Sequence, residues 1–286
     1  MDKSDGAWLD RMYNNRQLVP QAGDILARWT SDSARARSQE ECALDLAYGA
    51  GPNERLDVFP AMPGGTPGAP VLVYLHGGYW RALDKSDFSF VAPAFTRHGA
   101  CVVVPNYALC PAVSITQITL QMVEAVAWTH RNIALFGGDP GRITVVGHSA
   151  GGQLAGMMLA CLWQQVGSDL PAGTVRSAMA ISALNDLEPI MHTPFLQGDL
   201  RLTPREVARC SPARLPAPAQ GKLYSIVGGD ESAEFLRQFR LVHERWGGSR
   251  VPVCESLPGL NHFTVMDALV DPSQRLHQLA LDLLRE

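Results

Sequence analysis

The segment Gly147-His148-Ser149-Ala150-Gly151 has the residue types of a turn that presents a nucleophilic serine. Such a serine needs small residues two positions before and after it, because the sharp strand-to-helix turn brings its backbone close to neighbouring strands. An apolar run at 143–146 precedes the segment, and Leu154 and Met158 follow at helical spacing. This context predicts that Ser149 is a nucleophile for acyl transfer instead of a buried serine at a Gly-rich helix start.

A second Gly-rich segment, HGGYW at 76–80, follows the apolar run at 71–75. Backbone N–H groups of residues without a Cβ can closely approach a substrate oxygen on which negative charge develops. We therefore expect the N–H groups of Gly77, Gly78 and Ala150 to bind that oxygen.

The aromatic residues of the same segment are candidates for the substrate pocket. Tyr79 and Trp80 follow the glycines directly and could line it, although Trp80 could equally pack beneath the loop. His76 is expected to be a hydrogen-bonded scaffold residue, not an acid or base.

A serine hydroxyl is a weak nucleophile until a histidine accepts its proton and an acid orients that histidine. His262 is the expected base, because it lies in a loop after the apolar run at 251–257, whereas His243 and His277 lie within helical patterns. A loop position allows a histidine to reach over the carboxyl edge of a sheet.

The acid has more than one candidate. Asp230 is the first choice because it comes directly after the strand pattern at 222–227, and Asp186, after the run at 177–182, is the main alternative. Glu231 is expected to point elsewhere, in the first turn of the next helix, where a carboxylate suits the helix dipole.

After residue 70, apolar runs of strand length alternate with segments of helix length, and these elements position the candidate residues. Runs apolar on both faces indicate strands covered by helices on both sides, which predicts a doubly wound, mainly parallel α/β sheet. The expected strands are 71–75, 100–104, 143–146, 177–182, 222–227 and 251–257, and the expected helices lie near 87–97, 116–134, 150–164, 231–246 and 273–285. Two earlier strands, 44–48 and 56–59, are expected to form a hairpin ahead of a Pro/Gly-rich loop at 60–70.

Two segments lie outside this alternation. Residues 1–38 predict a helical arm, which could pack on its own chain or on a neighbour's, so a homodimer stays open. Residues 183–221 are far longer than an ordinary connection and predict a cap insertion over the site. Within it, Met191, Phe195 and Leu196 could face the substrate or pack inward, and 204–210 is a short helix candidate.

Composition excludes several classes of protein. The 286 residues are 46% hydrophobic and 18% charged with a net charge of -4, which suits a globular enzyme and not a nucleic-acid binder. No apolar run approaches the roughly 18 residues of a membrane helix, and the polar start lacks a signal-peptide pattern, so we expect a cytoplasmic protein. Six scattered cysteines, and the lack of metal or dinucleotide motifs, predict no disulfide frame, no metal and no cofactor.

Together the motifs resemble those of the α/β-hydrolase-fold kynurenine formamidases, or arylformamidases, within the wider group of HGG-type esterases and lipases. HGGYW is similar to the family's HGG-x-W loop, GHSAGG at 147–152 to its nucleophile elbow, and GDESAEFLRQ at 229–238 to its acid loop and S-x-E-F-x-R-Q helix. YNNR at 13–16 also resembles that group, while NYAL at 106–109 resembles the Y-R-L segment of the esterases with Ala in place of Arg.

This resemblance implies a single α/β-hydrolase domain over 1–286 and a small-molecule substrate, N-formyl-L-kynurenine. It would be cleaved to L-kynurenine and formate through Ser149, His262 and Asp230 and a formyl-enzyme intermediate. The alternative is a general carboxylesterase for short-chain acyl esters. A binding protein with an inactive site is disfavoured because candidates for the whole triad are present.

Overall fold

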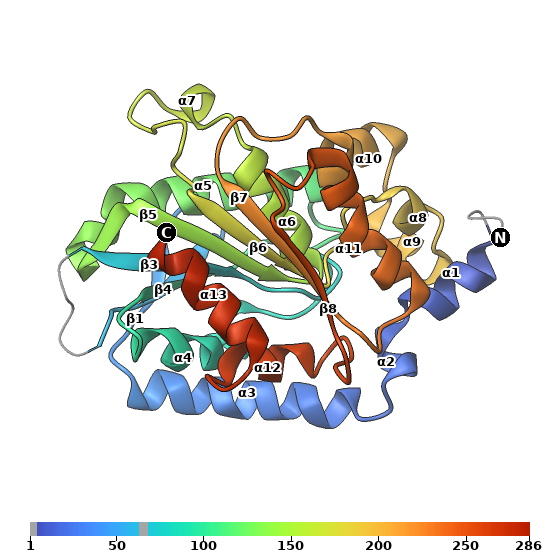
Figure 1. Ribbon diagram of the computed structural model, residues 1–286, viewed down its shortest axis with the longest axis horizontal. Coiled ribbons are helices and arrows are strands. Elements are labelled where there is room, and N and C mark those ends of the chain that lie inside the picture. Colours follow the sequence, from blue (N-terminus) through green and yellow to red (C-terminus); the bar gives the residue numbers. More distant parts are fainter. Residues whose placement is uncertain (1–4, 63–67) are drawn as a thin grey trace.

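The computed structural model describes residues 5–62 and 68–286, and builds them on one eight-stranded sheet with the strand order β1-β2-β4-β3-β5-β6-β7-β8 (Figure 1). The first two strands run antiparallel to their neighbours, and β3 to β8 pair in parallel. The strands are β1 (Ala43–Ala47), β2 (Arg55–Phe59), β3 (Ala69–Leu75), β4 (Cys101–Pro105), β5 (Gly138–His148), β6 (Ser177–Ile181), β7 (Lys222–Gly228) and β8 (Val253–Leu257). Residues 1–4 of the predicted arm and 63–67 of the predicted Pro/Gly-rich loop lie outside the described residues.

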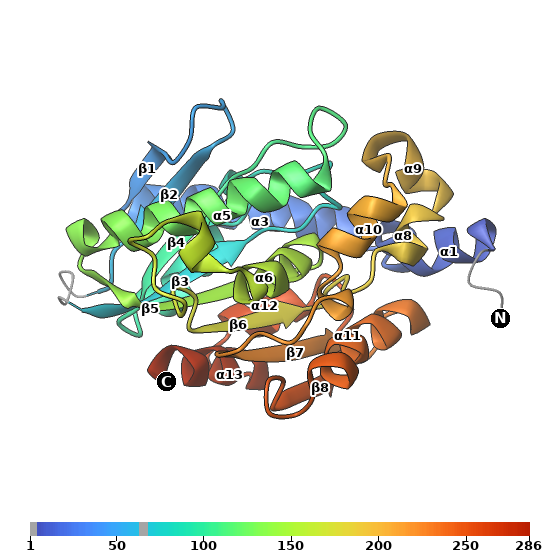
Figure 2. The same ribbon diagram turned by 90° about the horizontal axis from the view of Figure 1, so that it is seen from above.

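Helices cover both faces of the sheet, as the doubly apolar strands predict (Figures 1 and 2). In β3, Val71 and Val73 face one hydrophobic core while Leu72 and Tyr74 face the other, because successive side chains of a strand point to opposite faces. The first core includes α5 (Ile115–Asn132), α6 (Ala150–Ala160) and α11 (Ala233–Trp246); the second includes α3 (Ala22–Gln39), α4 (Ala92–Thr96), α12 (Val265–Val270) and α13 (Arg275–Arg285). The observed architecture, an α/β-hydrolase fold, confirms the predicted fold class.

The N-terminal arm packs on its own chain. It consists of α1 (Gly6–Tyr13), α2 (Asn15–Leu18) and the long α3, and α3 lies along one face of the molecule (Figure 1). Trp29 of α3 stacks on Phe90, with ring centroids 5.6 Å apart. At the other end of the arm, α1 packs against α9 (Pro194–Leu200) and α11.

The long interval at 183–221 folds into short helices rather than an irregular loop. It contains α8 (Glu188–Met191), α9 and α10 (Pro204–Cys210), of which only α10 was predicted, together with the 3-10 turn Pro212–Arg214. Leu196 is completely buried in the first core, so it does not face the substrate side, whereas Met191 and Phe195 are half-buried. Pro residues at the starts of these helices fix backbone angles that suit a helix's first turn.

The strand order reverses direction between β3 and β5, which are neighbours in the sheet. Loops that leave two such strands at their carboxyl ends diverge to opposite sides, so a crevice opens at that edge. HGGYW leaves β3 there and Ser149 leaves β5. The topology therefore places the two Gly-rich motifs side by side at the position where open α/β sheets bind ligands.

Candidate active site

Ser149 lies on a strained turn between β5 and α6. Its backbone has φ 58° and ψ -119°, a conformation that residues with a Cβ rarely adopt. A Cβ on Gly147 would collide with the backbone of Gly151, and one on Gly151 would collide with the carbonyl of Leu75. The small residues of the motif are thus required by close backbone approach, and the strained turn holds the serine side chain above the sheet edge.

His262 lies directly against this serine. Its Nε2 is 3.1 Å from Ser149 Oγ, and both residues are buried. The loop after β8 holds the ring in place, because the side-chain oxygen of Asn261 accepts from the N–H groups of Phe263 and Thr264. The structure brings these two predicted residues together in a geometry that allows a proton to pass from Oγ to Nε2.

The acid in contact with His262 is Glu231, which corrects the expectation that Asp230 would occupy this place. Glu231 Oε2 is 2.7 Å from His262 Nδ1, and the carboxylate is fully buried. Its other oxygen accepts from Ser182 Oγ at 2.5 Å and from the N–H of Gly228 at 2.9 Å. Three partners therefore fix the carboxylate, and one of them, Ser182, was not among the residues predicted for the site.

The turn after β7 explains why Glu231, and not Asp230, contacts His262. Hydrogen bonds from the N–H groups of Gly229 and Asp230 to the carbonyls of Leu257 and Leu260 attach this turn to the loop after β8. Asp230 is left on the exposed side, where its carboxylate accepts a long 3.3 Å hydrogen bond from the N–H of Gly259 and no other from the described residues. The chain then turns inward at Glu231, before the helix begins.

Asp186, the alternative acid, is used elsewhere. Its side chain accepts from Arg214 Nε at 2.8 Å and from the N–H of Glu188, and its backbone carbonyl accepts from Gln238. These contacts fix the start of the 183–221 segment and leave no contact between Asp186 and His262.

The HGGYW loop borders Ser149 through its first glycine. A Cβ on Gly77 would lie 3.1 Å from Ser149 Cβ and 3.0 Å from the carbonyl oxygen of His148, and Gly78 has φ 108°. Neither position accommodates a side chain without a shift, so the bare backbone of the loop lies next to the serine. Ala150 is the first residue of α6, on the other side of Ser149.

The other residues of this segment divide into scaffold and lining. Trp80 is completely buried and donates from Nε1 to Gln153 at 3.0 Å, so it packs beneath the loop and does not line the pocket. His76 is also buried, lies within 3.2 Å of Asn106 Oδ1 and stacks on Tyr107, with ring centroids 4.1 Å apart. Burial lowers the pKa of His76, which fits a neutral scaffold residue.

His148, directly before the serine, supports the histidine loop. Its Nε2–H donates to the backbone carbonyl of His262 at 2.8 Å. Burial, reinforced by the nearby His262, lowers the pKa of His148 well below its ordinary value, so its ring stays neutral at physiological pH. A second positive charge beside His262 is thereby avoided.

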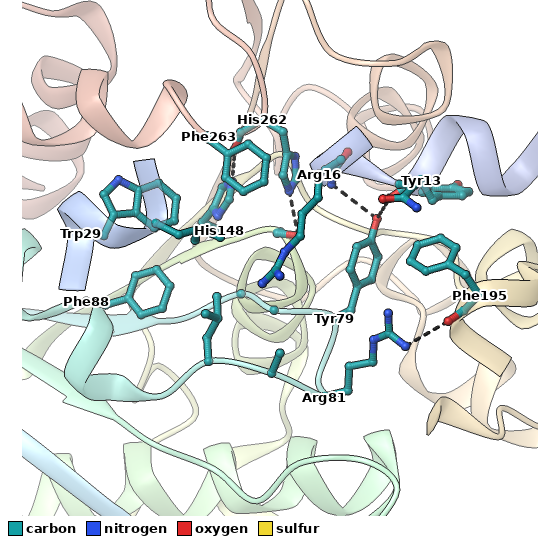
Figure 3. Close-up of a pocket in the computed structure, with 18 of the residues that line it drawn as sticks. Tyr13, Arg16, Trp29, Tyr79, Arg81, Phe88, His148, Phe195, His262 and Phe263 are labelled. Atoms are coloured by element: carbon teal, nitrogen blue, oxygen red, sulfur yellow. Dashed lines mark hydrogen bonds between the residues drawn. The ribbon is translucent and has the colours of Figure 1, made fainter. Parts of the chain in front are cut away.

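A pocket of about 410 Å³ opens over these groups, a volume within the range typical of small-molecule sites. Figure 3 shows aromatic side chains around it. Ser149 and His262 line it together with Trp29, Phe88 and Phe263, and the opposite wall carries Tyr79, Phe195, Arg16 and Arg81.

The arm and the 183–221 segment both contribute to that wall. Tyr79 donates its hydroxyl to the backbone carbonyl of Tyr13 at 2.7 Å, and its ring meets that of Phe195 edge-on at 6.0 Å. Tyr13 itself donates to Glu234 at 2.6 Å. No sequence motif predicts that α1 and α9 meet over the loop after β3.

The part of the chain that the structure describes contains neither a candidate metal site nor a candidate membrane-spanning helix. No group of three or more His, Cys, Asp or Glu side chains there could hold a metal ion. No helix among residues 5–62 and 68–286 is long and apolar enough to cross a bilayer.

Comparison with known proteins agrees with this fold. A family model described as the alpha/beta hydrolase fold matches residues 72–233. The chain therefore belongs to the α/β-hydrolase fold family and is a hydrolase.

More specifically, the chain is 31% identical to the kynurenine formamidase of Salmo salar over 87% of its own length and 84% of that protein. A crystal structure of a Silicibacter protein proposed to be a thioesterase superposes with a TM-score of 0.82, at 32% identity over 94% of this chain and 97% of the other. Esterase LipQ of Mycobacterium tuberculosis is 36% identical, but over only 40% of this chain and 28% of its own.

Proposed function

We propose that this protein hydrolyses aryl formamides, with N-formyl-L-kynurenine as its substrate. The observation that carries the proposal is the extent of similarity: the match to a kynurenine formamidase spans 87% of the chain. The match to an esterase covers 40%. Similarity over most of the chain supports a shared substrate more strongly than similarity over a minor part of it.

In the proposed mechanism, Ser149 Oγ attacks the formyl carbon while His262 Nε2 accepts its proton. Glu231 orients the ring through Nδ1 and stabilises the positive charge that forms on it. The N–H groups of Gly77, Gly78 and Ala150 donate to the oxygen that becomes negative.

The tetrahedral intermediate then collapses. His262 returns the proton to the nitrogen as the C–N bond breaks, so L-kynurenine leaves as a neutral arylamine and the formyl group stays on Ser149. Water attacks this ester with His262 as the base, and formate departs as the serine regains its proton. The two half-reactions together consume one water and need neither metal nor cofactor.

The pocket suits an aryl leaving group. Six Phe, Tyr and Trp side chains of the described residues line it, and an aromatic ring packs favourably against others in edge-on or offset arrangements. We propose that the 183–221 segment serves as a cap within the single domain and that its Phe195, against Tyr79, contacts the aryl side of the substrate.

A direct comparison of kcat/KM for N-formyl-L-kynurenine and phenyl acetate tests the proposal. We expect the formamide to be preferred by at least about tenfold, because only it can use the whole pocket in the transition state. Measurable ester hydrolysis without cleavage of the formamide would instead establish the second candidate, a general carboxylesterase. The partial match to esterase LipQ is the observation that favours this alternative.

A further inference from the structure

Two arginine side chains enter the pocket, and their surroundings differ. Arg81 donates to Asp199 at 2.5 Å and to the backbone carbonyl of Phe195 at 2.9 Å, so its charge is already compensated. Arg16 is exposed, and no carboxylate in the described ranges forms an ion pair with it. The proposed mechanism uses neither group.

Figure 3 shows the Arg16 side chain extending into the pocket from α2. Its backbone is well held: Asn15 is buried, and the carbonyl of Asn15 accepts from the N–H of Val19. On the preceding side, Tyr13 is fixed by hydrogen bonds with Glu234, Gln238 and Tyr79. A well-held backbone thus carries the exposed Arg16 guanidinium into the pocket.

An uncompensated guanidinium in a pocket with aromatic walls is suited to a planar anion, because its N–H donors match the two oxygens of a carboxylate. Glu231, the buried carboxylate beside His262, does not line the pocket and is already bonded to His262, Ser182 and Gly228. Arg16 is therefore the residue left to balance a negative charge on a ligand.

We propose that Arg16 is a specificity-determining residue that binds a carboxylate on the leaving-group side of the substrate. This inference rests on the proposed function, for which it would select acyl arylamines with an amino-acid tail over those without a carboxylate. Arg16 contacts the substrate away from the reacting bond, so it contributes to binding in the ground state and transition state alike.

Binding of the reaction product tests this without turnover. L-Kynurenine and kynurenamine, which lacks only the carboxylate, are titrated by calorimetry into the wild-type protein and into Arg16→Gln, Arg16→Lys and Arg11→Gln. Arg11 is the control, because it is an exposed arginine of the same arm that does not line the pocket.

We expect Arg16→Gln to raise the Kd for L-kynurenine about tenfold, the loss of one charge-assisted contact at a solvent-exposed site. The Kd for kynurenamine should stay the same or fall, since its ammonium group no longer meets a like charge. Arg16→Lys should recover part of the loss, and Arg11→Gln should bind both ligands as the wild type does.

Equal losses for both ligands, no loss, the same loss in Arg11→Gln, or no binding of L-kynurenine to the wild type would overturn the inference. Turnover of N-formyl-L-kynurenine is measured separately. If the wild type fails to cleave it while Arg16 still discriminates between the two products, the proposed function fails and the carboxylate site stands. If it is cleaved and Arg16→Gln leaves KM unchanged, the site fails and the function stands.

Discussion

Replacing Glu231 by Gln should nearly abolish activity while Asp230→Asn should not. The Gln amide would face the same three partners as the carboxylate, and two of them, Ser182 Oγ–H and the N–H of Gly228, donate to one oxygen. The amide oxygen therefore stays with these donors, and the NH₂ group faces His262 Nδ1. That arrangement forces the proton of the His262 ring onto Nε2. The Nε2 atom can then no longer accept the proton of Ser149.

The size of the effect follows from the charge that is lost. Glu231 Oε2 lies 2.7 Å from His262 Nδ1 in a fully buried position. Opposite unit charges about 4 Å apart attract by about 4 kcal/mol at an effective dielectric constant of about 20. Loss of that stabilisation in the transition state corresponds to about a 10³-fold lower kcat, and the wrong tautomer extends the loss toward about 10⁴-fold.

Steady-state kinetics on phenyl acetate, with thermal unfolding to verify that the variants fold, measure this effect for either candidate function. Asp230→Asn should lower kcat by less than about threefold, because the Asp230 side chain is exposed and makes only one long hydrogen bond. A folded Glu231→Gln variant within tenfold of wild type, or a larger loss in Asp230→Asn, would refute the reasoning.

Three further expectations follow from the site. Ser149→Ala should lower kcat by about 10⁴- to 10⁶-fold with the fold intact; a folded variant within tenfold of wild type would exclude a serine mechanism. Trp80→Phe should reduce the free energy of unfolding by about 2–4 kcal/mol in urea titrations, because the buried Gln153 loses its hydrogen-bond donor. KM should change by less than about threefold, and a large change in KM without loss of stability would show that Trp80 contacts the substrate. Phe195→Ala should lower kcat/KM at least about tenfold more for N-formyl-L-kynurenine than for a short aliphatic ester, since only the aryl substrate reaches α9; equal losses would show that α9 only supports the fold.

The sequence predicted the sheet and two of the site's contacting side chains because those features are local. Each predicted strand is present, and the inner strands β3, β4 and β6 are buried along nearly their whole length, as runs apolar on both faces predict. Ser149 and His262 were identified from their own flanking residues, a motif between a strand and a helix and a loop after a strand. Such signals lie within a dozen residues of the side chain that they position.

The acid was harder to predict from the sequence, because Asp230 and Glu231 are neighbours in a turn whose direction depends on contacts with the loop after β8. One local signal was available. Ser232 caps α11, whose first residue is Ala233, so Glu231 precedes the helix and is free to turn inward. A helix start two residues earlier had wrongly placed Glu231 in the first turn.

Tyr79 and Phe195 were candidates for the pocket walls, but how the walls assemble could not be predicted in this way, because α1, α2 and α9 meet the loop after β3 from distant parts of the sequence. Their chemistry also differs from that of the sheet edge. The sheet fixes Ser149 and His262 through backbone geometry that tolerates few substitutions, whereas Arg16 and Phe195 project from exposed or half-buried positions with few partners. Substitutions in those short helices can therefore change which leaving group is accepted without disturbing the groups that would break the acyl bond. We therefore expect substrate choice to depend mainly on the arm and the 183–221 segment, whose exchange between related hydrolases should change the leaving group while Ser149 and His262 keep their places.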